Sequence, residues 1–201
     1  KSTILNLIAK YYEAGGGTIS IGGKPIDHVA AERVLEQISM VDQNVFLFDD
    51  TIRENIRHAR PDATDAEIEA ACREANCDGF IRKMEKGYDT ELKEHGAGLS
   101  IGQRQLIAFA RTMISMPKIL ILDEATSSID THTEILVQKG IEALLSGRTS
   151  FVIAHRLSTI KNAEKILVLT ENGIEEEGTH EELLAKKGIY EKLYHMQFQK
   201  Q

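Results

Sequence analysis

Three continuous apolar runs constrain the fold of this chain more than any other feature of its sequence. They are KILILD at residues 118–123, TSFVIAH at 149–155 and KILVLT at 165–170. Apolar runs without polar alternation are typical of strands buried on both faces of a parallel sheet. A helical pattern from about Thr131 to Leu145 separates the first two runs. Together they predict an α/β fold with a mainly parallel sheet that is flanked by helices.

Two other regions interrupt this pattern. Residues 13–27 contain GGGTISIGGKPID, which predicts two short strands around a Gly-Gly turn and hence a small antiparallel part. Residues 50–115 are helical and polar, and Thr64 with Glu67 forms a capping box there. We therefore expect an inserted helical subdomain at about 50–115, with a catalytic core built from residues 1–49 and 116–201.

Length, charge and cysteine content limit the class of protein. The 201 residues suffice for one sizeable domain, and the net charge of −7 argues against a nucleic-acid partner. A local anion site remains compatible with that charge, because a helix terminus can bind phosphate in an acidic protein. Cys72 and Cys77 are expected to be small, half-buried residues of a protein from a reducing compartment. The first residue is Lys1 and no strand precedes it, so the chain is expected to be a fragment.

The first three residues, Lys1-Ser2-Thr3, stand at the start of a helical pattern. Alone the tripeptide is uninformative, but it matches the end of the phosphate loop GxxxxGK[ST]. In that loop the lysine reaches the β- and γ-phosphates and the first hydroxyl residue, here Ser2, coordinates Mg²⁺.

An acidic pair follows the first apolar run. Asp123 ends the strand and Glu124 comes next. The carboxyl ends of parallel strands form the crevice where such sheets bind ligands. Asp123 is predicted to hold Mg²⁺ through water, and Glu124 to act as general base for an attacking water. The alternative is an acidic pair that only caps the following helix.

Two further polar residues end predicted strands. Gln43 follows the strand ISMV and is a candidate to bind Mg²⁺ or to position water. His155 follows TSFVIA and is a candidate to bind a γ-phosphate and to orient Glu124. Taken alone, Gln43 is better explained as a polar residue at the end of a strand, and His155 as an ordinary loop residue.

The segment LSIGQ stands at the start of an amphipathic helical pattern and is followed closely by the apolar run LIAFA. Ser100 and Gln103 form a capping box, and Gly102 permits close approach of a ligand. A helix start also carries about half a positive charge and unpaired N–H groups. Capping and phosphate binding therefore use the same residues, and only the rest of the sequence separates the two interpretations.

The order of these motifs, KST, Gln43, LSIGQ, ILILDE, SSID and His155, resembles the nucleotide-binding domain of ATP-binding cassette (ABC) transporters. The resemblance covers essentially the whole chain and is strongest to exporters of the multidrug and lipid type. It implies a P-loop NTPase fold and ATP hydrolysis with Mg²⁺. The positions that match the family motifs are Walker A (Lys1, Ser2, Thr3), the Q-loop (Gln43), the signature (Ser100, Gly102, Gln103), Walker B with its base (Asp123, Glu124), the D-loop (Asp130) and the switch histidine (His155).

The resemblance also implies partners. In this family two such domains enclose two ATP molecules head to tail, so the signature of one chain completes the site of the other. DTELKEHGAG, residues 89–98, resembles the exporter X-loop, which touches the coupling helices of the transmembrane domains. A homodimer and a heterodimer are both compatible with the sequence. The expected location is the cytoplasmic face of the plasma membrane, as part of a transporter.

Two other functions remain as alternatives. A soluble ABC-type ATPase of DNA repair would usually carry coiled-coil or zinc insertions, and the 50–115 region has neither heptads nor a cysteine cluster. A non-hydrolysing regulatory domain would not need Glu124 and His155. The glycine-rich half of Walker A is not within the sequence. We therefore expect this chain alone to bind ATP poorly, and the upstream loop to restore binding.

Overall fold

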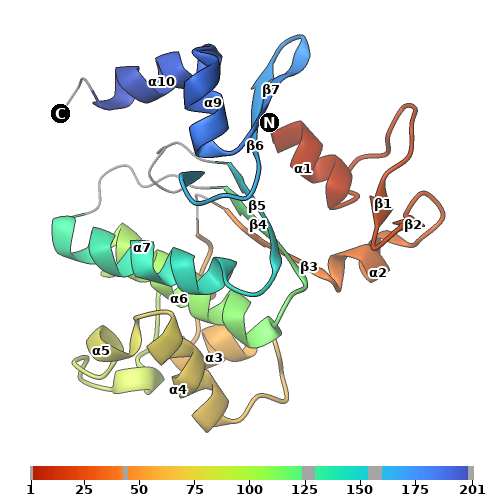
Figure 1. Ribbon diagram of the computed structural model, residues 1–201. Helices are drawn as coiled ribbons and strands as arrows, with labels where there is room; N and C mark the ends of the chain where they lie inside the picture. The colour runs from red at the N-terminus through yellow and green to blue at the C-terminus, as the bar shows by residue number, and fades with distance from the viewer. Residues whose placement is uncertain (1, 43–44, 124–129, 154–159, 199–201) are drawn as a thin grey trace. The chain divides into compact units, whose positions relative to one another are not determined.

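The computed structural model describes residues 2–42, 45–123, 130–153 and 160–198 (Figure 1). The chain forms two compact units, which are residues 2–151 and 152–201. The helices of the first unit are α1 (Ser2–Ile8), α2 (Ala31–Leu35), α3 (Ile52–Arg57), α4 (Asp65–Glu74), α5 (Asp78–Ile81), α6 (Ile101–Ser115) and α7 (Thr131–Leu145), with a 3₁₀ turn at Gly87–Asp89. Its strands are β1 (Ser20–Ile21), β2 (Lys24–Pro25), β3 (Ile38–Val41) and β4 (Ile119–Asp123), and β5 (Thr149–Ile153) crosses into the second unit.

A three-stranded sheet in the order β3-β4-β5 organises the first unit. Strands β3 and β4 are parallel, and their register pairs Ile38 with Ile119 and Val41 with Leu122. The run 118–123 is buried as expected, from Ile119 through Leu122. The expectation for 149–153 is wrong, because none of the residues of β5 is buried. Among the described strands of this sheet, β4 lies between β3 and β5, whereas β5 is paired on one side alone.

Helix α6 forms the core of the helical region. Its apolar side chains, among them Leu106, Phe109 and Met113, are buried, and the helix contacts α3, α4, α7 and β3. Figure 1 shows α6 between α7 on one side and α3 and α4 on the other. Close packing against α7 requires Gly140, because a Cβ there would lie 2.9 Å from Phe109 Cδ2. Beyond the helix end, Met116 is left-handed and Pro117 cannot continue the helix.

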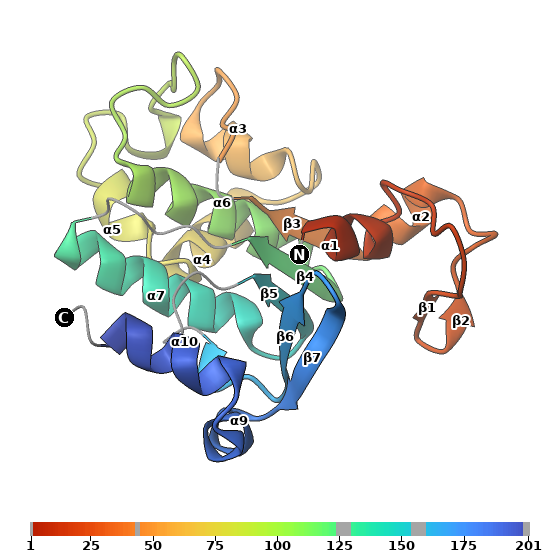
Figure 2. The ribbon, with the colours of Figure 1, turned by 90° about the horizontal axis from the view of Figure 1, so that it is seen from above.

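The short hairpin forms where the glycines predict it. Strands β1 and β2 pair antiparallel around Gly22 and Gly23, whose φ angles are +57° and +75°. Two consecutive positive φ angles match a two-residue hairpin turn, and glycine adopts them at low cost. Figure 2 shows this hairpin away from the three-stranded sheet, whereas α2 contacts β3. Lys10 links α1 to the segment after β2, since its ammonium donates to the carbonyl oxygens of Ile26 (2.8 Å), Asp27 (3.0 Å) and Val29.

The second unit is built on a hairpin and two helices, β6 (Ile166–Thr170), β7 (Gly173–Gly178), α9 (His180–Lys186) and α10 (Ile189–Phe198). Ile166, Val168, Leu183 and Tyr190 form its core. The run 165–170 was expected to be a buried strand of the parallel sheet, and this is wrong. Strand β6 pairs antiparallel with β7, and Leu167 is 45% exposed. The hairpin is joined by a short turn, which favours antiparallel pairing.

Within the described ranges, no helix combines the length and the apolar character needed to cross a bilayer. Both cysteines are free, but they are fully buried rather than half-buried. Cys72 faces the interior from α4, and Cys77 sits where the chain turns into α5. Burial raises the pKa of the Cys77 thiol, so the thiol is not an activated nucleophile.

The capping box of α4 makes a pH-dependent contribution to stability. The Glu67 carboxylate accepts hydrogen bonds from the Thr64 N–H (2.8 Å) and the Thr64 hydroxyl (2.7 Å), and it pairs with Arg60. These bonds to the charged form lower the pKa of Glu67 to about 2. A depressed folded pKa stabilises the fold above the unfolded value of about 4.5, and this stabilisation is lost as the pH falls towards 2.

We therefore expect Glu67→Gln to lower the free energy of unfolding at pH 6, and the difference from wild type to shrink steadily below about pH 4.5. Urea unfolding between pH 6 and pH 3 measures this difference. In a Thr64→Ala background the same exchange should keep part of its pH dependence, because alanine removes the hydroxyl bond but keeps the backbone N–H of residue 64 and the Arg60 partner. A difference that stays constant over the whole range would contradict the assignment.

Candidate functional site

The parallel register of β3 and β4 defines the edge of the sheet where the predicted Mg²⁺ ligands begin. Val41 is paired with Leu122, so Asp123 and Asp42 leave the sheet at the same edge. Asp123 is partly buried and ends β4, as predicted from the sequence. A carboxylate there supplies the hard oxygen ligand that Mg²⁺ prefers. Gln43 and Glu124 lie outside the described residues, so their chemical roles stay predictions.

The signature segment forms the N-terminus of α6 with the predicted capping box. Ser100 is the N-cap residue, and its hydroxyl oxygen accepts the N–H of Gln103 at 3.2 Å. In return the Gln103 side-chain oxygen accepts the N–H of Ser100 at 2.9 Å. Both bonds use acceptor oxygens, whereas the Ser100 O–H and the Gln103 amide N–H groups are donors. The same two side chains can therefore cap the helix and donate hydrogen bonds to an anion. Gly102 is buried in the same turn.

The charge at the helix starts separates α6 from most other helices. Acidic residues in the first turn favour a helix, and α4, α7 and α9 each have at least one. Among the described helices only α1 and α6 have none. These are the two helices whose first residues match phosphate-binding motifs. The sequence contains this signal, but it appears only once the helix boundaries are known.

The remaining predicted ATP-binding residues are placed as follows. Ser2 and Thr3 form the first turn of α1, and Thr3 is exposed. Asp130 is the N-cap of α7, where its carboxylate accepts the N–H of Thr133 at 3.0 Å. This bond caps the helix, and the role of Asp130 towards ATP stays a prediction. Lys1 and His155 lie outside the described residues.

An exposed aromatic group was not predicted from the sequence. Phe46 and Phe48 are 52% and 39% exposed, and their rings meet edge-to-face at 5.2 Å between centroids. His95 lies 4.7 Å from the Phe46 ring, and His58 lies 4.3 Å from the Phe48 ring. Large apolar side chains that gather in this way mark an interaction surface. Alternation of apolar and polar residues does not reveal the group, since its members come from positions 46–58 and 95.

The loop that carries His95 is held against this aromatic group. Glu94 and His95 both have positive φ angles, at 48° and 57°. Such angles cost energy for residues other than glycine, so contacts must hold the loop in place. The His95 N–H donates to the Asp49 carboxylate at 2.9 Å, and His95 Nδ1 lies 3.1 Å from the Leu47 carbonyl oxygen.

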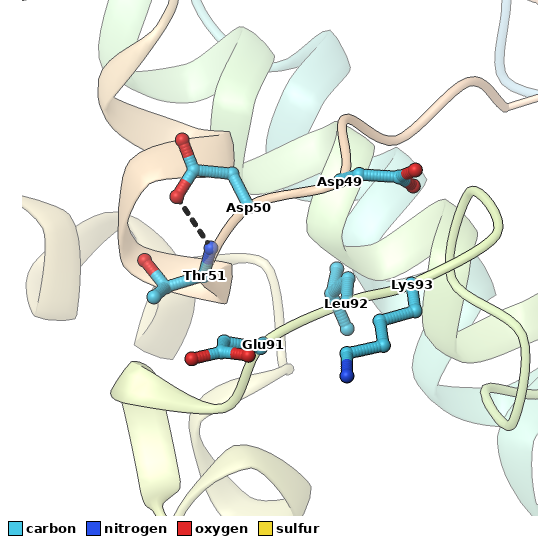
Figure 3. Close-up of a pocket in the computed structure, with 6 residues that line it drawn as sticks. All are labelled: Asp49, Asp50, Thr51, Glu91, Leu92 and Lys93. Carbon is cyan, nitrogen blue, oxygen red and sulfur yellow. Dashed lines mark hydrogen bonds between the residues drawn. The ribbon is translucent and has the colours of Figure 1, made fainter.

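A pocket adjoins the same loop (Figure 3). Two chain segments, 49–51 and 91–93, form it side by side, joined by a bridge between Thr51 and Glu91. Its lining residues are Asp49, Asp50, Thr51, Glu91, Leu92 and Lys93. Three carboxylates against a single ammonium do not suit a triphosphate, because like charges repel. The pocket is therefore not the nucleotide site.

Comparison with known proteins identifies relatives over nearly the whole chain. A family model described as ABC transporter matches residues 1–127. An uncharacterised ABC transporter ATP-binding protein of Bacillus subtilis is 50% identical over 198 residues, covering 98% of this chain and 33% of that protein. The ATP-dependent lipid A-core flippase of Desulfotalea psychrophila is 49% identical over 197 residues, covering 98% of this chain and 34% of the flippase. The chain thus spans about a third of the length of the curated relatives it matches.

A solved structure supports the same relationship. The structure of a bacterial Atm1-family ABC exporter with ATP bound superposes with a TM-score of 0.89 at 41% sequence identity. The match covers 98% of this chain and 34% of the exporter chain. It confirms the α/β P-loop NTPase fold with its small antiparallel part.

Proposed function

This chain belongs to the ABC transporter family as an ATP-binding domain, and from that premise we propose that it hydrolyses ATP to power export across a membrane. In the proposed site, Lys1, Ser2 and Thr3 bind the phosphates from one side. Ser100, Gly102 and Gln103 of a second domain bind them from the other side. The second domain is a copy of this chain or a homologous partner.

One observation carries this proposal. The two helices without acidic residues in the first turn, α1 and α6, are those that would meet the phosphates. A carboxylate at either start would repel a triphosphate, even though it would stabilise the helix. Helix capping alone does not explain why α6 has no acidic residue in its first turn, because the capping boxes of α4 and α9 use glutamate where α6 uses Gln103.

The hydrolytic step is assigned to residues at the strand ends. Glu124 accepts a proton from the attacking water, and His155 orients Glu124 and contacts the γ-phosphate. Asp123, with Ser2 and Gln43, would hold Mg²⁺, which when bound would neutralise charge on the phosphate oxygens. The oxygen donors of this set fit a hard cation. Asp130 is assigned to the ATP site from the D-loop match.

Removal of the metal tests this assignment directly. Chelation of Mg²⁺ should lower phosphate release from ATP by more than about a hundredfold, because the phosphate charge is then left to protein groups alone. Addition of Mg²⁺ should restore the rate. The unfolding temperature without ATP should not change on chelation, since no metal is assigned to the fold itself. Phosphate release that persists in chelator would contradict the assignment.

A membrane domain is the proposed partner of the aromatic surface. We define the docking surface as Phe46, Phe48, His95 and the pocket of Figure 3. Its apolar centre with a charged rim has the anatomy of a protein interface. The segment 89–98 resembles the exporter X-loop, so we assign a cytoplasmic helix of the transmembrane domain as the occupant. This assignment places the chain at the cytoplasmic face of the membrane.

The alternative of a soluble ABC-type ATPase has less support. The relatives include proteins named flippase and ATP-binding/permease protein, and the docking surface needs a partner. A non-hydrolysing regulatory domain is separated from an ATPase by measured phosphate release from the intact protein.

A further inference from the structure

Arg111 makes an unusual set of contacts for a residue in the middle of a helix. It lies on α6, about three helical turns after Ser100. Its guanidinium donates three hydrogen bonds, to the Asn55 carbonyl oxygen (2.8 Å), the Asn55 side-chain oxygen (2.8 Å) and the Phe46 carbonyl oxygen (3.0 Å). It also lies 5.3 Å from the centroid of the Phe48 ring. All these contacts are made with residues on or beside the docking surface.

Asn55 completes the connection from α3. It is fully buried, and its side chain binds both backbone groups of Phe48 at 2.9 Å, accepting from the N–H and donating to the carbonyl oxygen. It also donates to the Thr51 carbonyl oxygen at 3.0 Å. A buried amide with this many partners fixes the backbone around it, since losing a partner leaves a polar group unsatisfied.

The chemistry of Arg111 is matched to this position. Its three acceptors are neutral oxygens, so the guanidinium acts as a rigid fork rather than as one half of an ion pair. Burial lowers the pKa of Arg111, which remains charged at neutral pH. A lysine could carry the charge but has no planar fork to reach all three oxygens.

From these contacts we propose that Arg111 and Asn55 are positioning residues that lock segment 46–48 to the signature helix. Displacement of the docking surface then moves the N-terminus of α6 with it, and so changes the contact of Ser100 with ATP. This inference rests on the proposed function, because it assigns a role to the docking surface. It adds two residues outside the sequence motifs to the apparatus that couples the membrane domain to hydrolysis.

The test uses Arg111→Lys in the complete transporter, with ATP and Mg²⁺ as the only ligands. We expect kcat for hydrolysis to fall at least fivefold, KM for ATP to change less than twofold, and the unfolding temperature to stay close to wild type. The matched control is Arg82→Lys, since Arg82 is exposed and pairs with Asp78 and Glu69 away from segment 46–48. The control should leave kcat and KM unchanged.

A double-mutant comparison separates coupling from a local structural effect. The variant with Phe46→Ala and Phe48→Ala should by itself lower kcat. In the Arg111→Lys background the same two changes should lower kcat little further, if both variants act through one connection. The proposal would be overturned if the fold-decreases in kcat multiplied in the combined variant. It would also be overturned if Arg111→Lys had the kcat of wild type.

Hydrogen exchange gives a readout that does not depend on hydrolysis. Arg111→Lys should speed exchange of the Phe48 amide at least tenfold and leave amides of α4 unchanged. Unchanged protection of Phe48 would overturn the lock even if the protein is an active ATPase. If the Phe48 amide exchanges fast in Arg111→Lys but the wild-type protein releases no phosphate, the proposed function is contradicted and the lock is not.

Discussion

Replacement of Ser100 by Asp should leave the domain as stable as wild type and remove most of its ATP hydrolysis. Aspartate is as good an N-cap residue as serine, so the start of α6 keeps its cap. It also places a carboxylate where the proposed site binds the γ-phosphate. Like charges brought together at an interface cost several kcal/mol, which corresponds to a loss on the order of a hundredfold or more. Phosphate release and urea unfolding on the same sample measure both effects.

The alanine variants calibrate this prediction. Ser100→Ala removes the cap and should cost about 1 kcal/mol of stability, and Thr64→Ala should cost about the same because it breaks the same motif in α4. Only the change at position 100 should slow hydrolysis. The less stable Ser100→Ala should therefore be more active than the fully stable Ser100→Asp. If Ser100→Asp turns over ATP at the wild-type rate, the capping interpretation alone is sufficient.

Glu124→Gln should abolish hydrolysis and preserve ATP binding. A general base contributes roughly 10²- to 10⁴-fold to a rate, and glutamine keeps the shape of glutamate but cannot accept the proton of water. The assignment to Glu124 is a prediction from the Walker B match, with Asp123 beside it at the end of β4. In the protein with the complete phosphate loop, calorimetry should give a Kd for ATP within about threefold of wild type, since no lost interaction reaches 1 kcal/mol.

The matched control for Glu124→Gln is Glu134→Gln, a similar carboxylate in the first turn of α7. It should leave the rate near that of wild type. Retained turnover in Glu124→Gln would assign the base to another residue. Loss of both binding and turnover would indicate a role in ATP binding instead.

Local signals in the sequence predicted local structure well. The capping boxes at Thr64 and Ser100, the Gly22-Gly23 turn and the helix from Thr131 to Leu145 all form as expected. Each depends on residues within one or two turns of each other, so the sequence carries the whole physical cause. The order of the functional motifs also predicted the family, which comparison with known proteins confirms.

Features that depend on distant partners were not predicted. An apolar run such as 165–170 does not reveal whether its partner will be parallel, and here the antiparallel partner β7 decides. Arg111 and Phe46 are 65 residues apart, and no local pattern connects them. The burial of Cys72 likewise depends on how α4 packs against its neighbours α6 and α5. In each case the missing information was tertiary contact rather than residue chemistry.

The central claim is that each ATP site takes its signature segment from a second domain, and mixing two inactive variants tests it most directly. Copies with Ser100→Asp and copies with Glu124→Gln are each expected to be inactive alone. In a mixed pair, the site that combines the intact Glu124 of one copy with the intact Ser100 of the other is whole. Equal mixing should restore about a quarter of the wild-type phosphate release, because half of the pairs are mixed and each has one whole site of two. With formation of mixed pairs verified by two different tags, a mixture no more active than its two components would contradict a site shared between two copies of this domain.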